Sequence, residues 1–245
     1  MSDDAISVYQ PDTDIARALV VVAHPDDIDF GMAGTVAVLT AQGVDVAYCL
    51  VTSGDAGGDD STHTRAERAA IREAEQTVAG AVLGVTSLTF LRWPDGQVEA
   101  TLELRQALAR VIRQHRPDLV ITQSPERNFD RIYASHPDHM AAGEAALCAV
   151  YPDARNPHAF PTLLEEGLDP HVVKTVWVGG FAPNLVVDIT DTFDAKIAAL
   201  RSHVSQVGDR DDLDEMMRTW AVTNGEIGGL PEGRLGEIFR IVNTA

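Results

Sequence analysis

The sequence predicts a single α/β domain built on a Rossmann-like, mainly parallel sheet with helices on both faces. Short apolar runs of strand length alternate with stretches of helical period, and this alternation is typical of such a sheet. The chain has 245 residues, 45% of them hydrophobic, which is enough to bury one large core. No long linker interrupts it, so we expect one domain over 1–245, with a core of about 16–206 and a C-terminal helical extension of about 207–245.

Six apolar segments have the length of buried strands, and helices are expected between and after them. The expected strands are 18–23, 45–52, 87–91, 119–122, 175–178 and 185–189, and the expected helices are 32–42, 64–83, 102–115, 192–205 and 211–223. Gly43 and Gly84 follow the first two helices, and Pro117 follows the third, as helix ends require. A further helix should begin near His136, with Ser135 as its N-cap and Pro137 at an early helical position.

The polar residues that interrupt this pattern follow successive strands. His24 comes after the first expected strand, Gly54 and Asp55 after the second, 93–96 after the third and 124–139 after the fourth. In an open parallel sheet, ligands bind at the carboxyl ends of the strands, near the point where the strand order reverses. We therefore expect these residues on one rim, with two long loops, 54–63 and 125–134, beside it.

Charge and composition exclude several classes of partner. The 37 acidic residues outnumber the 19 basic ones, and the net charge of −18 would repel both a phosphate backbone and an anionic membrane. The first residues are polar, and no apolar run approaches the roughly 20 residues of a membrane span. We expect a soluble cytoplasmic protein that binds neither nucleic acid nor membrane. Cys49 and Cys148 are expected to be free, buried thiols.

Two separated clusters carry metal-ligand side chains. The first is His24-Pro25-Asp26-Asp27, at the end of a buried strand, and the second is the segment 136–139, with the sequence HPDH. Imidazole and carboxylate without thiolate suit Zn²⁺, Fe²⁺ or another divalent metal, and a catalytic zinc site has three protein ligands and one open position. His24, one aspartate of the first cluster and one histidine of the second would complete such a set.

The remaining members of the two clusters could then do acid–base chemistry. Adjacent side chains on an extended segment point in different directions, so one of Asp26 and Asp27 should coordinate while the other stays free. Zinc lowers the pKa of a bound water from ~15.7 to ~7, and a free carboxylate can accept its proton. His136 and His139 lie three residues apart on one helix face, so one could bind metal while the other stabilises the substrate oxygen or protonates the leaving amine.

At these residues the sequence resembles the PIG-L, or LmbE-like, deacetylase family, which removes N-acyl groups from amino sugars. The resemblance is carried by segments in the expected order: 23–27 (AHPDD) with Gly34-Thr35, 52–55 (TSGD), Arg72 and Glu75 before 83–85 (LGV), 94–96 (PDG), 116–118 (RPD), 136–139 (HPDH), 187–189 (VDI), His203, Ser205 and Gln206. It implies that His24, Asp27 and His139 bind zinc and that Asp26 is the general base.

The same resemblance implies roles for five further residues. His136 would be the general acid or oxyanion stabiliser, and Asp138 would orient one imidazole. Arg72 and Asp95 match positions that contact the sugar. The chain has Ile28-Asp29 where many members place a glutamate, so Asp29 would take the supporting role.

Other features leave alternatives open. A tyrosine that some relatives place two residues before the second cluster is replaced by Ala134, with Tyr133 one residue further away, so the role of that hydroxyl is open. His203 could face the pocket or lie elsewhere on its helix.

Several of the same residues also have structural interpretations. The aspartate pair could form a turn or a helix cap, and His139 could simply pair with Asp138. Arg72 and Glu75 could form a solvated pair on one helix, and Asp95 in Pro-Asp-Gly suits a β-turn.

The function predicted is that of a zinc-dependent hydrolase that removes an N-acetyl group from an amino sugar or related glycoconjugate, giving free amine and acetate. Two alternatives remain: an amidase acting on a larger thiol or sugar conjugate, and a non-catalytic sugar- or metal-binding module. The sequence leaves open the substrate beyond a small N-acetylated sugar, the choice of metal and whether the chain forms a homo-oligomer.

Overall fold

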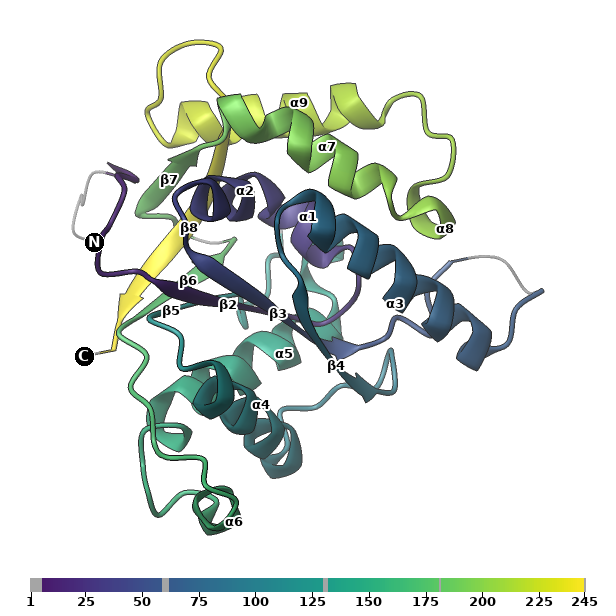
Figure 1. Ribbon diagram of the computed structural model, residues 1–245. Helices are drawn as coiled ribbons and strands as arrows, with labels where there is room; N and C mark the ends of the chain where they lie inside the picture. Colours follow the sequence, from purple (N-terminus) through teal and green to yellow (C-terminus); the bar gives the residue numbers. More distant parts are fainter. Residues whose placement is uncertain (1–5, 59–61, 130–131, 181, 245) are drawn as a thin grey trace.

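The computed structural model describes residues 6–58, 62–129, 132–180 and 182–244, so parts of both long loops, and the side chains of Tyr133 and Ala134, lie outside the description. One eight-stranded sheet forms its centre, in the order β1-β7-β8-β6-β5-β2-β3-β4 (Figure 1). The strands are β1 (Ser7–Val8), β2 (Arg17–Val22), β3 (Asp45–Thr52), β4 (Ser87–Trp93), β5 (Leu119–Thr122), β6 (Thr175–Gly179), β7 (Leu185–Asp188) and β8 (Gly236–Asn243). Strand β8 runs antiparallel to β6 and β7, and the other described pairs are parallel. The predicted α/β class and mainly parallel sheet are confirmed.

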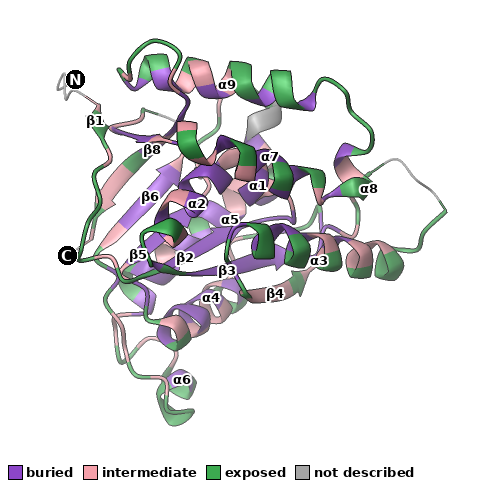
Figure 2. Ribbon diagram, turned by 45° about the horizontal axis from the view of Figure 1, so that its top comes forward, coloured by how far each residue is buried: buried purple, intermediate pink, exposed green. Residues whose placement is uncertain are grey.

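Helices cover both faces of this sheet (Figure 1). One face carries α1 (Asp27–Gly31), α2 (Ala33–Ala41), α3 (Arg65–Val82), α7 (Phe193–Arg201), α8 (Val204–Val207) and α9 (Leu213–Ile227). The other carries α4 (Leu102–His115), α5 (Pro137–Cys148) and α6 (Pro161–Glu165). The central strands and the inner sides of the helices are buried, whereas the outer helix faces are exposed (Figure 2). Among the described residues, we find no helix with both the length and the apolar character needed to cross a bilayer.

Strand β2 lies where the strand order reverses. It pairs with β3 on one side and with β5 on the other, and the chain continues from β3 to β4 at one edge and from β5 to β6 in the opposite direction. The chain leaves β2 for α1 on one face of the sheet and β5 for α5 on the other face, and such a switch point is where open α/β sheets bind ligands. The loops after β2 and β5 lead to α1 and α5, which carry the two predicted ligand clusters.

The structure corrects the C-terminal part of the prediction. Helix α9 is present, but the stretch after it forms β8 instead of a continued helical extension. The strand inserts between β6 and β7, and its Glu237 carboxylate accepts the backbone N–H groups of Gly34 and Thr35 and pairs with the buried Lys196 at 2.7 Å. These partners lie far away in sequence, so local periodicity gave no sign of them.

Two helix boundaries also differ from the prediction. His136, not Ser135, is the N-cap of α5, because its Nδ1 accepts the N–H of Asp138 at 3.2 Å, while Pro137 takes the first helical position as predicted. The single helix expected over 192–205 breaks at Ser202, so that α7 and α8 are separate. His203 stands at this break.

Helix α5 approaches the end of β5 at Gly143. A Cβ at this position would lie 2.3 Å from the carbonyl oxygen of Gln123, the residue just beyond β5. Gly143→Ala is therefore expected to push the helix outward and to lower the free energy of unfolding by about 1–3 kcal/mol. Gly31→Ala is the matched control, because no atom lies within 4 Å of its added Cβ. Urea unfolding of both variants checks this, and equal midpoints would contradict it.

Candidate metal and catalytic site

His24 projects from the second residue after β2 and is buried, with 7% exposure. The preceding peptide is fixed, because the N–H of Ala23 donates to Oε1 of Gln123, at the end of β5, at 2.9 Å. The backbone N–H of His24 donates to Oδ2 of Asp27 at 2.7 Å. These contacts fix the backbone that carries the His24 ring at the ends of the paired strands β2 and β5.

Atoms of three side chains, including His24 itself, converge at one edge of this ring. Nδ1 of His24 lies 3.2 Å from Nε2 of His139 and 3.3 Å from Oδ2 of Asp27, and Nε2 of His139 lies 3.0 Å from Oδ1 of Asp27. Ligands that bind one zinc ion tetrahedrally at ~2.1 Å stand about 3.4 Å apart. The separations between atoms of His24, Asp27 and His139 are close to this value, although the two Asp27 contacts use different oxygens, so binding of one divalent cation by these three residues stays a prediction.

The other side of the His24 ring faces carboxylates. Nε2 of His24 lies 3.1 Å from Oδ1 of Asp95 and 3.2 Å from Oδ2 of Asp138. A neutral ring that donates through Nε2 keeps the Nδ1 lone pair directed toward Asp27 and His139, as a metal ligand requires. Asp138 is itself fixed by the N–H groups of Gly96 and Val98, at 2.7 and 3.2 Å.

The cluster is electrostatically suited to a cation. Burial lowers the pKa of His24, but Asp27, Asp138 and Asp95 together raise it to about 12. Burial raises the pKa of Asp27, but His139 and His24 outweigh it and hold that pKa well below its usual range. The carboxylates thus favour a positive charge in this cluster, whether that charge is a proton on His24 or a bound cation.

Asp26 lies beside these ligands, and its side chain points to a different partner. Its Oδ2 accepts a hydrogen bond from the buried Arg72 at 3.1 Å. Burial raises the pKa of the Asp26 carboxyl, Arg72 opposes the rise and Asp27 adds to it, so that the pKa is about 7. A carboxyl near this pKa can exchange a proton at neutral pH, which is what a general base must do.

His136 completes a triangle of three imidazoles. Its ring centroid lies 5.1 Å from that of His24 and 5.2 Å from that of His139. Because Nδ1 accepts the Asp138 N–H, a neutral His136 ring carries its proton on Nε2. The three histidines can also offer nitrogens within 4.8 Å of one another, so an all-imidazole ligand set is a second arrangement that the geometry admits.

Comparison with protein-family models gives a match to PIG-L, described as GlcNAc-PI de-N-acetylase, over residues 19–150. This range is more than half of the chain and contains both clusters. The chain belongs to the PIG-L family. It is also 34% identical over 230 residues to a diacetylchitobiose deacetylase of Thermococcus kodakarensis, covering 91% of this chain and 82% of that protein.

Two further similarities agree with PIG-L membership. A protein of Bacillus anthracis named as a probable N-acetyl-α-D-glucosaminyl L-malate deacetylase 2 is 29% identical, covering 78% of this chain and 81% of that one. The crystal structure of N,N′-diacetylchitobiose deacetylase from Pyrococcus horikoshii, complexed with its inhibitor MPG, superposes with a TM-score of 0.85. It is 33% identical and covers 94% of this chain and 85% of that one.

Two residues that the PIG-L resemblance places at the sugar have mainly protein contacts. The Arg72 guanidinium donates to the carbonyl oxygens of Pro25 at 2.6 Å and Gly54 at 3.0 Å, besides Asp26. Asp95 contacts His24 and accepts the N–H of Ala56 at 3.0 Å. The structure thus gives both residues a part in holding the site together, and their sugar contacts stay predictions.

Arg72 and Glu75 do not form a solvated pair with each other in this PIG-L chain. Arg72 is only 3% exposed, and the Glu75 carboxylate instead accepts hydrogen bonds from the backbone N–H and hydroxyl of Ser205, at 2.7 and 2.6 Å. Glu75 therefore ties α3 to α8.

Sequence reasoning missed Gln76. Its Oε1 accepts the backbone N–H of Asp26 at 2.8 Å, and its Nε2 donates to Oδ2 of Asp29 at 2.8 Å. The sequence indicates Gln76 only in part: it lies four residues after Arg72 and therefore shares the same helix face. The side chain of Tyr133 lies outside the described residues, so its role stays open.

Proposed function

We propose that this chain is a metal-dependent N-deacetylase that hydrolyses the N-acetyl group of an amino sugar or related glycoconjugate, giving free amine and acetate. The observation that carries the proposal is the convergence of His24, Asp27 and His139 within 3.0–3.3 Å, with the Asp26 carboxylate bound to Arg72 and the His136 ring next to these three residues. A module that only retained metal would need neither of these two additional groups.

The metal would be held by His24, Asp27 and His139. Zn²⁺ is our first choice and Fe²⁺ the second, because the donors are imidazole and carboxylate. When bound, the ion would supply Lewis acidity that lowers the pKa of water and polarises the amide carbonyl. Asp138 would keep the His24 ring in the tautomer that presents Nδ1 to the ion.

The remaining steps belong to side chains of this chain. Asp26, held by Arg72, would accept a proton from the attacking water. The Nε2–H of His136 would stabilise the developing oxyanion of the amide by a hydrogen bond, and the proton accepted by Asp26 would pass, directly or through His136, to the leaving amine. These roles need one carboxylate and one imidazole that do not bind the metal.

The relatives favour an N-acetylglucosamine unit as the substrate, since two of them are named for diacetylchitobiose and one for a glucosaminyl malate. Next to the Asp95 turn, an open cleft of about 820 Å³ is lined by residues of α3 and the end of β4, including Arg65 and Trp93. We place the part of the substrate beyond the N-acetyl sugar there.

Release of acetate from a panel of N-acetylated substrates tests the function. The panel would hold N-acetylglucosamine, its β-linked di- and trisaccharides, and malate, inositol and thiol conjugates. Turnover of at least one sugar is expected, and chelation should abolish it because the Lewis acid is removed, with recovery on adding Zn²⁺. Turnover of thiol conjugates alone would favour the amidase.

Failure to cleave any amide despite bound metal would favour the non-catalytic binding module. A mock-chelated sample, carried through the same buffer exchange without chelator, is the control. A cytoplasmic location stays a prediction, which cell fractionation would test, and the oligomeric state stays open and can be measured by light scattering.

A further inference from the structure

The backbone of Asp26 adopts an unfavourable conformation. Its φ is 85° and its ψ is −26°, in the left-handed region that costs a non-glycine residue about 1–2 kcal/mol. Such a conformation persists only where the surroundings hold it. Two side chains of α3 do so: Arg72 contacts the Asp26 carboxylate, and Gln76, one helical turn further on, accepts the Asp26 N–H.

We propose that Gln76, held in place by Asp29 and His203, is a positioning residue that fixes the peptide of Asp26 for catalysis. The proposal rests on the function proposed above and extends it to residues that contact neither metal nor substrate. Gln76 acts through both ends of its amide. One end binds the Asp26 peptide at 2.8 Å, and the other binds Asp29 at 2.8 Å.

Asp29 and His203 form the fixed end of this chain of contacts. Nε2 of His203 lies 2.8 Å from Oδ2 of Asp29, the oxygen that also accepts from Gln76, and both side chains are 0% exposed. Gln76 is equally buried. His203 lies at the break between α7 and α8, which brings its ring to Asp29. The sequence left open whether His203 faces the pocket, and the structure shows that its ring makes a buried contact with Asp29.

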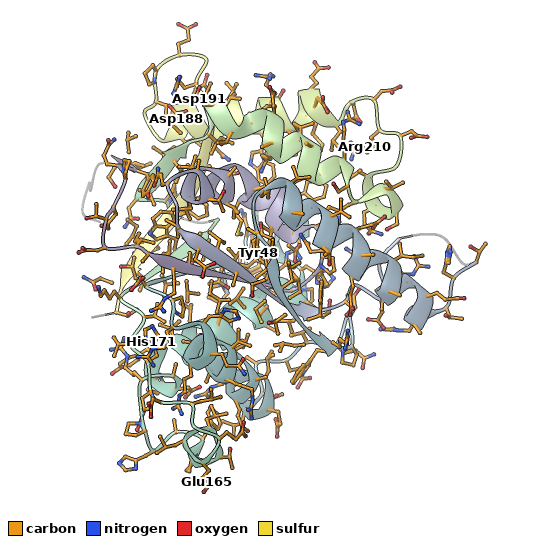
Figure 3. The ribbon with its side chains drawn as sticks, viewed as in Figure 1. Tyr48, Glu165, His171, Asp188, Asp191 and Arg210 are labelled. Carbon is orange, nitrogen blue, oxygen red and sulfur yellow. The ribbon has the colours of Figure 1, made fainter. Side chains whose placement is uncertain are left out.

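A purely structural account leaves the choice of these residues unexplained. Burying polar groups costs free energy unless every one is paired, and Oδ1 of Asp29, Nδ1 of His203 and the hydroxyl of Tyr48 have no protein hydrogen-bond partner among the described residues. Tyr48 lies in the middle of the molecule (Figure 3). Apolar side chains in place of Asp29, His203 and Tyr48 would pack here at a lower cost in free energy. The amide of Gln76, in contrast, is needed if the Asp26 peptide is to be held by a hydrogen bond.

The direction of the contacts also fixes the orientation of the Gln76 amide. The Asp29 carboxylate can only accept when ionised, so it selects the NH₂ end of Gln76 and turns the carbonyl toward Asp26. Nε2 of His203 contacts the same accepting oxygen at 2.8 Å. Replacing either residue would free the amide to rotate and so release the Asp26 peptide.

The test compares variants that break this chain of contacts with variants that keep it. Gln76→Met and His203→Met should lower kcat about 10–100-fold, with KM and metal content close to those of the wild type. His203→Gln should recover kcat to within about 3-fold of the wild type, because the glutamine NH₂ reaches the position of Nε2. If the methionine variants do not fold, Gln76→Asn serves instead, since it keeps a buried amide but retracts it by one carbon.

Glu237→Gln is the matched control, because it weakens another buried polar contact, with Lys196, that does not involve Asp26. Its kcat should stay within about 2-fold of the wild type even if its melting temperature falls. The proposal is overturned if Gln76→Met keeps full kcat, if His203→Gln is as slow as His203→Met, or if the control loses kcat equally. An inactive wild-type protein would refute the proposed function instead, so the two failures are distinguishable.

Discussion

Asp26→Ala is expected to keep about one metal ion per chain and to lose turnover by ~10²–10⁴-fold, the usual contribution of a positioned acid or base. The carboxylate of Asp26 is bound by Arg72, not by the cluster of His24 and His139, so its removal should leave the three ligand atoms in place. Elemental analysis and steady-state kinetics on the same preparation measure both quantities.

Asp27→Ala is the matched control for that variant, because it removes the neighbouring carboxylate. Its Oδ1 and Oδ2 lie 3.0 and 3.3 Å from the two ligand imidazoles, so it should lose metal as well as activity. Equal metal loss in the two variants would show that the division of labour between the aspartates is wrong. Full activity in Asp26→Ala would remove it as the general base.

The position of the site could be predicted because it follows from strand ends. The apolar strands 18–23 and 119–122 predicted where His24 and the second cluster lie along the sheet, and a parallel sheet brings such carboxyl ends to one rim. The helix that starts at Pro137 also followed from local sequence, because proline suits the first helical turn. These features depend on near neighbours in the chain.

The contacts behind the site could not be predicted, because they join distant segments. Gln76 meets Asp29 across 47 positions, and His203 meets Asp29 across 174. Nothing in the local pattern of α3 distinguishes Gln76 from a solvated polar residue. The burial of Arg72 depends likewise on Gly54, where a Cβ would lie 2.2 Å from the guanidinium. Each of these contacts can be identified only in the folded structure.

The same limit applies to the choice among ligand sets. Residue types left open which histidine of the second cluster binds metal, and the fold brings both rings within reach of His24. The distances favour His139, whose Nε2 lies close to both His24 and Asp27. His136 is turned by its N-cap contact with the backbone of Asp138. A local cap therefore gives different surroundings to two histidines that look equivalent in sequence, and their separate roles stay predictions.

His139→Ala should therefore empty the metal site, while His136→Ala should leave it filled. Loss of a partner that merely orients a ligand costs 10–100-fold in metal affinity, so loss of a ligand should cost more than ~100-fold. Titration of the metal-free variants with Zn²⁺ measures both affinities. His136→Ala should still lower turnover by ~10²–10⁴-fold, because the acid is gone. Loss of metal in His136→Ala equal to that in His139→Ala would instead show that His136 is also a ligand.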